Sequence, residues 1–100
     1  MILAELKLRL GEIYGGRLSE MILYGSHARG DAEQGSDVDV LVVLSGKADA
    51  AEEISRTSAL VSDISLRHDA VVSCVFIDEE TFLRRNGPLL RNVRRDGVKV

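Results

Sequence analysis

The chain has 100 residues, of which 45% are hydrophobic and 29% are charged, and its formal net charge at pH 7 is −3. This length and composition are typical of one globular domain, so we expect a single domain over residues 1–100. The negative net charge argues against a protein that binds nucleic acid through bulk charge. The single cysteine excludes an internal disulfide and a zinc site built from several cysteines.

The first 15 residues mix charged residues with apolar ones. This mixture is typical of neither a signal peptide nor a membrane span. We therefore expect a cytoplasmic protein with a reduced cysteine and no contact with a membrane.

The first half of the chain alternates helix and strand. Helical spacing of apolar residues predicts an amphipathic helix over residues 2–14, and an apolar run predicts a strand over 18–24. Ser26 is a suitable N-cap for a short helix that ends near Ala32. The run 38–44 is apolar and β-branched, which predicts a buried strand. The residues expected on the inner face of the first helix are Leu3, Leu6, Leu10 and Ile13.

The second half continues the alternation. We expect an amphipathic helix over residues 48–67, a strand over 69–77, a short helix capped by Asp78, a helix over 88–95 and a short strand over 98–100. This order favours an α+β (mixed α/β) fold, in which a small mixed β-sheet is flanked by helices. The residues expected on the inner face of the long helix are Ala51, Ile54, Ser58, Val61 and Ile64.

Two aspartates, Asp37 and Asp39, stand at the start of the most strand-like run. Residues two apart on a strand point to the same face, about 6.5–7 Å apart. Two like charges held on one face repel, and a divalent cation would relieve that repulsion. Mg²⁺ prefers oxygen ligands and is commonly held by one or two carboxylates together with substrate phosphates. The pattern Asp-x-Asp alone is a weak signal, because it also occurs in surface turns.

The preceding loop strengthens the interpretation. Gly25 permits close approach of a ligand to the backbone, and Ser26 adds a hydroxyl at the start of a helix. Arg29 lies one turn further on and is suited to pair with a phosphate. Gly35 and Ser36 let the chain return so that the aspartates face the same space. These features predict a phosphate-binding site beside the two carboxylates.

The pattern Gly-Ser-x-Ala-Arg-Gly followed by Ser-Asp-x-Asp-x-x-Val resembles the minimal nucleotidyltransferase (MNT) domains of the DNA polymerase β-like superfamily. The resemblance covers nearly the whole chain and implies the polymerase β-like nucleotidyltransferase fold. It implies that Asp37 and Asp39 bind Mg²⁺ and that nucleotide phosphates bind near Gly25, Ser26, Arg29 and Ser36. It also implies transfer of NMP from a nucleoside triphosphate, by default ATP, to an acceptor hydroxyl.

The family uses a third carboxylate on a neighbouring strand. The candidate in this chain is Asp69, which the sequence places at the start of the third strand. Its role would be that of a metal ligand or a general base toward the acceptor hydroxyl. The alternative is that Asp69 only belongs to the turn between helix and strand.

The resemblance also implies a partner, because stand-alone members often act as antitoxins of HEPN-domain toxins and adenylylate them. The leading hypothesis is thus an Mg²⁺-dependent transfer of AMP to a protein partner. The alternative is a catalytically weak nucleotide-binding module that neutralises its partner by steric binding. A third interpretation, nucleic-acid binding by the arginine-rich segment 84–99, is disfavoured by the net charge and by the lack of an aromatic stacking face.

Overall fold

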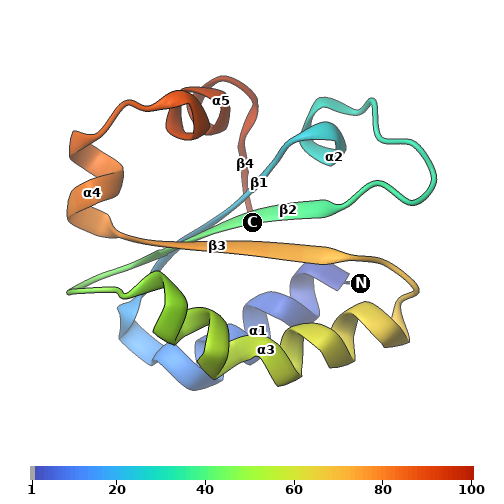
Figure 1. Cartoon of the computed structure of the whole chain (residues 1–100), viewed down its shortest axis with the longest axis horizontal. Helices are drawn as coiled ribbons and strands as arrows, with labels where there is room; N and C mark the ends of the chain where they lie inside the picture. Colours follow the sequence, from blue (N-terminus) through green and yellow to red (C-terminus); the bar gives the residue numbers. More distant parts are fainter. Residues whose placement is uncertain (1) are drawn as a thin grey trace.

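The computed structural model describes residues 2–100. Its centre is one four-stranded sheet in the order β3-β2-β1-β4 (Figure 1). β2 and β3 run parallel, whereas β1 pairs antiparallel with both β2 and β4. The predicted small mixed sheet is therefore confirmed. The strands are β1 (Leu18–Tyr24), β2 (Val38–Leu44), β3 (Val72–Asp78) and β4 (Val98–Lys99).

Helices cover both faces of the sheet (Figure 1). The two long helices, α1 and α3, lie together on one face, and the three short helices lie on the other. A 3₁₀ turn at Gly15–Arg17 connects α1 to β1. The helices are α1 (Ile2–Tyr14), α2 (Ser26–Arg29), α3 (Ala50–Arg67), α4 (Glu79–Arg84) and α5 (Pro88–Asp96).

The strand β2 forms the centre of the core, and its two faces belong to two different layers. Val40 and Val42 pack with α1 and α3, while Leu41 and Val43 pack with α5 and β1. All four side chains are fully buried. Side chains on both faces of this strand are buried, one face in each layer. Its sequence is therefore one continuous apolar run, as is usual for strands covered on both faces. The aspartates at its start are the exception to that run.

The inner face of α3 differs from the predicted one. Glu53 and Thr57 are buried, whereas Ile54 is half exposed. The carboxylate of Glu53 is stabilised there because it accepts a hydrogen bond of 2.7 Å from the hydroxyl of Tyr14 and lies 3.4 Å from the guanidinium of Arg56. A pattern of apolar residues cannot show such a contact, because Tyr14 belongs to another helix. The buried residues of α3 are Glu53, Thr57, Leu60 and Ile64.

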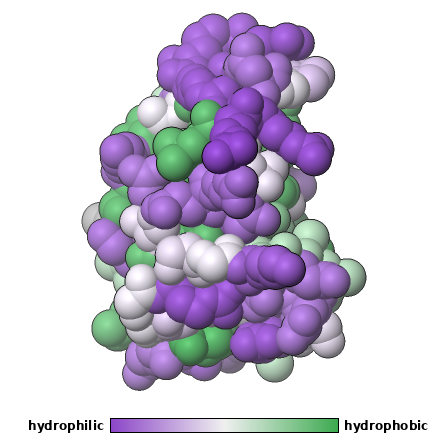
Figure 2. Space-filling model, turned by 90° about the vertical axis from the view of Figure 1, so that its left-hand side faces the viewer, coloured by the Kyte–Doolittle hydropathy of each residue, from purple (hydrophilic) through white to green (hydrophobic). Residues whose placement is uncertain are grey.

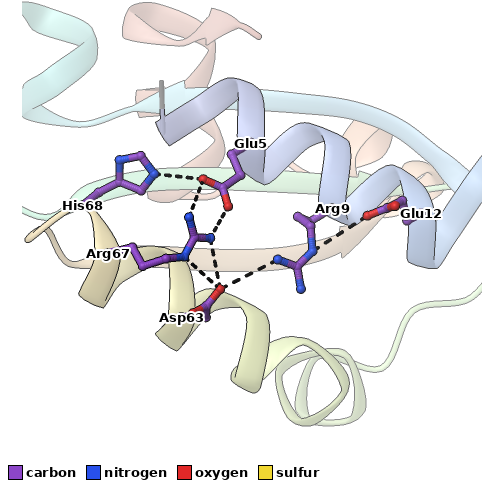
Figure 3. Close-up of polar contacts among 6 residues, drawn as sticks. All are labelled: Glu5, Arg9, Glu12, Asp63, Arg67 and His68. Carbon is purple, nitrogen blue, oxygen red and sulfur yellow. Dashed lines mark hydrogen bonds and ion pairs between the residues drawn. The ribbon is translucent and has the colours of Figure 1, made fainter.

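A network of charged side chains joins α1 to the C-terminal half of α3 (Figure 3). Glu5 pairs with Arg67 and lies 2.9 Å from Nε2 of His68. Arg67 also pairs with Asp63 at 3.0 Å, and Arg9 lies 3.8 Å from the same carboxylate. The hydrogen bonds from Arg67 and His68 lower the pKa of Glu5 to about 2. Each carboxylate of this network therefore faces a cationic or hydrogen-bonding group of the protein.

Several expected boundaries shift, most clearly those of the short helix and of the third strand. The short helix ends at Arg29, because Gly30 adopts the left-handed conformation and terminates it. Its N-cap is Gly25 and not Ser26, and no side chain caps it. The third strand starts at Val72, because Asp69 takes a positive φ of 51° in the turn that follows α3. Asp78 caps α4 as predicted, since its side chain accepts a hydrogen bond of 2.7 Å from the N–H of Thr81.

The arginine-rich segment is largely engaged within the molecule. The guanidinium of Arg94 donates hydrogen bonds to the carbonyl oxygens of Phe82 and Arg85, so it fixes the turn between α4 and α5. Arg95 pairs with Asp96 at 3.1 Å. These contacts give at least two of the arginines a structural role, which weakens the interpretation of the segment as a nucleic-acid-binding surface.

Candidate active site

The two aspartates lie where β1 ends and β2 begins. The sheet register places Asp39 between Tyr24 of β1 and Ser73 of β3. Paired residues on neighbouring strands point to the same face, so these three side chains form a row across the sheet. Asp37 precedes the strand by one residue, and it is close enough for its charge to act on Asp39. Asp39 shares its face of β2 with Leu41 and Val43, which pack with α5, so the row faces away from α1 and α3.

Gly25 lies directly against the carboxylate of Asp39. A Cβ atom at position 25 would stand 2.5 Å from Oδ2 of Asp39, which is closer than any real contact of that kind. The backbone at Gly25 has φ 76° and ψ −156°, a conformation that is essentially restricted to glycine. Two independent requirements, space and backbone geometry, therefore select glycine at this position. The backbone N–H groups that open α2 are thereby held next to the aspartate pair.

The electrostatics of the pair are unfavourable in the protein alone. Burial raises the pKa of Asp39, and the neighbouring charge of Asp37 raises it further, while His27 and Arg29 act in the opposite direction. Within residues 2–100 neither aspartate has an ion pair or a side-chain hydrogen bond. Burial also raises the pKa of Tyr24, with a smaller contribution from the charge of Asp39. The site thus holds negative charge that the described residues leave without a direct counter-charge.

The loop between α2 and β2 is organised by its own hydrogen bonds. The hydroxyl of Ser36 accepts a hydrogen bond of 3.0 Å from the N–H of Glu33. Nε2 of His27 lies 3.2 Å from the carbonyl oxygen of Ser36. The hydroxyl of Ser36 thus stabilises the turn that precedes Asp37, and its role in nucleotide binding stays a prediction. Ser26 lies at the first position of α2, beside Gly25.

Arg29 points from α2 toward the C-terminal end of α5. It lies 3.2 Å from the carboxylate of Asp31 and 3.9 Å from that of Asp96. Asp96 sits in the last turn of α5, where the helix dipole disfavours a negative charge, so the contacts with Arg29 and Arg95 offset that cost. The predicted phosphate partner thus has carboxylate partners in the protein, and Asp96 is a neighbour of the site that the sequence did not reveal.

The structure does not bring Asp69 together with the other two aspartates. Among residues 2–100, no group of three His, Cys, Asp or Glu side chains is arranged to hold a metal ion. Asp69 is exposed in the turn before β3 and lines a surface hollow with Gly35 and Val71. The position of β3 in register with Asp39 is Ser73, a residue that sequence reasoning missed. The pairing register of parallel strands is set by tertiary contacts, and no local pattern signals it.

The donor set is compatible with Mg²⁺ bound together with a nucleotide. Two carboxylates on one strand face, beside a backbone that a phosphate can approach closely, match the way Mg²⁺ is usually held by one or two carboxylates and substrate phosphates. A dedicated cage for an isolated metal ion would need more protein ligands. Asp37 and Asp39 are therefore the residues that would hold the metal, with the phosphates as its other ligands.

A surface hollow of about 410 Å³ lies at the opposite end of the sheet. It is lined mainly by charged side chains of α4 and the segment before α3, and Asp78 at its wall pairs in register with the last residue of β2. Figure 2 shows that this end of the molecule is mostly hydrophilic, with only separate apolar areas. The hollow is thus remote from Asp39, which lies at the start of β2. No helix among residues 2–100 is both long and apolar enough to cross a membrane.

Two curated proteins are similar to this chain in sequence. Both come from Methanocaldococcus jannaschii, and each is named "Putative protein adenylyltransferase". MJ0604 is 35% identical over 85 residues, covering 84% of this chain and 79% of its own length. MJ0141 is 33% identical over 87 residues, covering 78% of this chain and 87% of its own length.

Solved structures share the fold. The structure of a "putative nucleotidyltransferase" from Sulfolobus solfataricus superposes with a TM-score of 0.70 at 22% identity, over 98% of this chain and 75% of that one. A toxin–antitoxin structure with AMP-PNP gives 0.65 at 22% identity, over 95% and 69%. A complex of tri-AMPylated Shewanella oneidensis HEPN toxin with MNT antitoxin gives 0.55 at 22% identity, over 99% and 71%.

A family model also matches most of the chain. The model described as "Nucleotidyltransferase domain" matches residues 3–98, which include every element from α1 to the start of β4. The polymerase β-like fold predicted from the Gly-Ser and Asp-x-Asp pattern is confirmed by the solved structures. This chain therefore belongs to the nucleotidyltransferase domain family.

Proposed function

We propose that the chain is an Mg²⁺-dependent nucleotidyltransferase that transfers AMP from ATP to a hydroxyl group of a protein partner. The observation that carries the proposal is the pair Asp37 and Asp39, held without a counter-charge over the backbone of Gly25. The names of the two M. jannaschii relatives support a protein as the acceptor. The AMP-PNP in a structural neighbour supports ATP as the donor.

The chemistry assigns a distinct role to each element. The backbone at Gly25 and Ser26 binds and orients the triphosphate, and the two carboxylates hold Mg²⁺, which neutralises charge on the phosphates when bound. The acceptor oxygen forms a bond to the α-phosphorus, and the bond from that phosphorus to the bridging oxygen breaks. Pyrophosphate leaves with the electron pair. The proton of the acceptor hydroxyl passes to a water molecule, because no third carboxylate among residues 2–100 lies with Asp37 and Asp39 to accept it.

We further propose that the partner is a HEPN-type toxin and that the chain acts as its antitoxin. The support is the similarity of the fold to an MNT antitoxin in complex with an AMPylated HEPN toxin. The test is to incubate the purified chain with a HEPN-domain toxin, ATP and Mg²⁺, and to measure the intact mass of that toxin. Addition of AMP that disappears in Asp37→Asn and Asp39→Asn is the expected result. An unchanged mass, with both proteins folded, contradicts the proposal.

One observation favours a second candidate, a nucleotide-binding module that neutralises its partner by steric binding. Ser73 occupies the β3 position in register with Asp39, so the neighbouring strand supplies a hydroxyl there in place of a carboxylate. A weak catalyst would still bind Mg²⁺ and ATP through Asp37 and Asp39. The two candidates differ in cells: an Asp37→Asn/Asp39→Asn double variant still protects against the toxin if binding is sufficient, and fails to protect if AMP transfer is required.

A further inference from the structure

The outer edge of β3 is an unpaired strand edge. β3 is the first strand in the sheet order, so only one of its sides pairs with β2. The N–H of Val38 donates to the carbonyl oxygen of Val71 at 2.8 Å, which sets the parallel pattern in which residues 71, 73 and 75 bond toward β2. The backbone groups of Cys74 and Phe76 therefore point away from the sheet. Within residues 2–100 their N–H groups have no hydrogen-bond acceptor, whereas that of Val72 bonds to the hydroxyl of Ser65.

This edge lacks the features that usually protect an exposed strand. Natural edges carry charges, proline or a bulge, or they are very short. β3 has seven residues and no proline, and the last of them, Asp78, is its one charged residue, whose side chain caps α4. At the other edge, β4 has only two residues, and Lys99 there pairs with Glu20 at 2.8 Å. The β3 edge is therefore the side of the sheet that is open to pairing with another strand.

An uncharged groove runs along the β3 edge on the side of α3. Ile54 is 51% exposed and Val71 is 56% exposed, and both border the strand without a covering element. The groove accepts apolar side chains on one face of an added strand. Its walls are formed by Ile54, Ser58, Val61, Val72, Cys74 and Phe76.

The opposite face of the same edge leads to the aspartate pair. The row Tyr24, Asp39 and Ser73 ends at the β3 edge, so a strand added there would place one residue next in that row. Neighbouring strands lie about 4.8 Å apart, so the added backbone would lie about 10 Å from that of β2. A long hydroxyl side chain such as tyrosine spans much of this gap toward a nucleotide at Asp39, whereas serine is short for it.

Resting on the proposed function, we propose that the acceptor protein docks an extended segment on the β3 edge as a fifth strand. Alternate side chains of the segment enter the groove beside α3. Its hydroxyl residue lies beside Ser73, on the face of the sheet that carries Asp39. Backbone hydrogen bonds to Cys74 and Phe76 supply affinity, and the groove supplies specificity, as in other complexes formed by strand addition. The partner chemistry is thus an uncharged segment in which apolar residues alternate with hydroxyl residues around a tyrosine.

The test uses a short synthetic peptide in which valines alternate with threonine and a central tyrosine, and a scrambled peptide that lacks the alternation. Amide hydrogen exchange of the full chain, with Mg²⁺ and ATP, is followed by NMR. The alternating peptide is expected to slow exchange at Cys74 and Phe76 and to leave Ser73 and Val75, which already bond to β2, unchanged. An effect equal for both peptides, or none at the outward amides, overturns the proposal.

Two variants and one matched control test the same surface through transfer of AMP to the tyrosine peptide. Ile54→Glu places a charge in the groove and is expected to lower transfer about tenfold, or 1.4 kcal/mol. Cys74→Pro removes an outward donor while leaving the hydrogen bonds to β2 in place, so it is expected to act in the same direction. Leu8→Glu changes an apolar residue of α1 that is 66% exposed, away from this edge, and is expected to have no effect. Unchanged transfer by Ile54→Glu overturns the docking site.

Transfer of AMP and protection of the outward amides, measured separately, distinguish failure of this proposal from failure of the proposed function. If wild type transfers no AMP while the outward amides are still protected, the docking site stands and the activity fails. If transfer proceeds equally in Ile54→Glu and wild type, the activity stands and the docking site fails. If the amides of Cys74 and Phe76 are protected without peptide and the chain sediments as a dimer, a second copy covers the edge and the proposal is overturned.

Discussion

Two groups of carboxylates in this molecule experience opposite environments. In the network between α1 and α3, Glu5 is paired with Arg67 and His68, and its pKa is lowered to about 2. At the start of β2, burial and the charge of Asp37 raise the pKa of Asp39. The first group brings its own counter-charge and joins two helices. The second group has none among the described residues, which is typical of a site that binds a cation with its substrate.

The largest expected effect comes from removing the charge of the second group. Asp37→Asn or Asp39→Asn is expected to lower AMP transfer on the order of a hundredfold or more, because the proposed Mg²⁺ site would lose one of its two carboxylates. Glu5→Gln, which removes a carboxylate of the first group, is the matched control and should leave transfer unchanged at a temperature where it is folded. The measurement is the initial rate of acceptor modification. An equal loss of transfer in Asp37→Asn, Asp39→Asn and Glu5→Gln would contradict the proposal that only the carboxylates at the start of β2 act in transfer.

Gly25→Ala is expected to disturb the site next most strongly. The methyl group would stand against Oδ2 of Asp39, and the backbone there has a positive φ. We expect transfer to fall by about tenfold or more and the free energy of unfolding to fall by roughly 1–3 kcal/mol. Gly35→Ala is a useful control, because φ is 86° there but a Cβ would meet no atom within 4 Å. If both variants lose activity equally, backbone strain alone accounts for the effect.

Acid should destabilise the protein through the first group. The pKa of Glu5 is lower in the folded chain than its ordinary value of 4.5, so its contribution to stability is present above that value and is lost as the pH falls toward about 2. Thermal unfolding of wild type and Glu5→Gln, followed from pH 6 to pH 2, is the measurement. The difference in Tm between them should shrink as the pH falls. A constant difference would mean that Glu5 acts by packing and not by charge.

Asp39→Asn should change stability in the opposite direction. A raised pKa means that the ionised carboxylate is disfavoured in the fold, so a neutral amide is expected to stabilise the metal-free chain at pH 7. The expected gain is about 0.5 kcal/mol, since the site is partly solvated. The comparison is made by denaturant unfolding with a chelator present. A loss of stability would show that the carboxylate has a structural role as well.

The smallest expected effect is that of Asp69→Asn. Asparagine adopts a positive φ as readily as aspartate, so the turn is preserved. Because the structure does not bring Asp69 together with Asp37 and Asp39, we expect transfer to stay within about twofold of wild type. A loss as large as that in Asp37→Asn would show that Asp69 reaches the nucleotide when the acceptor is bound, as the sequence predicts.

The sequence was sufficient for features that depend on local patterns. The strand over residues 38–44, the cap at Asp78 and the approach of the Gly25 loop to the aspartates follow from residue types and spacing. It was not sufficient where contacts join distant segments. The burial of Glu53 depends on the hydroxyl of Tyr14, and the place of Ser73 beside Asp39 depends on the register of two parallel strands.

The only cysteine of the chain has a practical consequence. Cys74 lies in the middle of β3, and burial raises the pKa of its thiol to about 11. At neutral pH the reactive thiolate is therefore scarce, so a thiol reagent is expected to react slowly with the native protein. Because Cys74 also lines the groove beside α3, a strand bound along this edge would cover it and slow the reaction further. The absorbance change of a thiol reagent, recorded with and without a bound peptide, would measure that protection on the native protein.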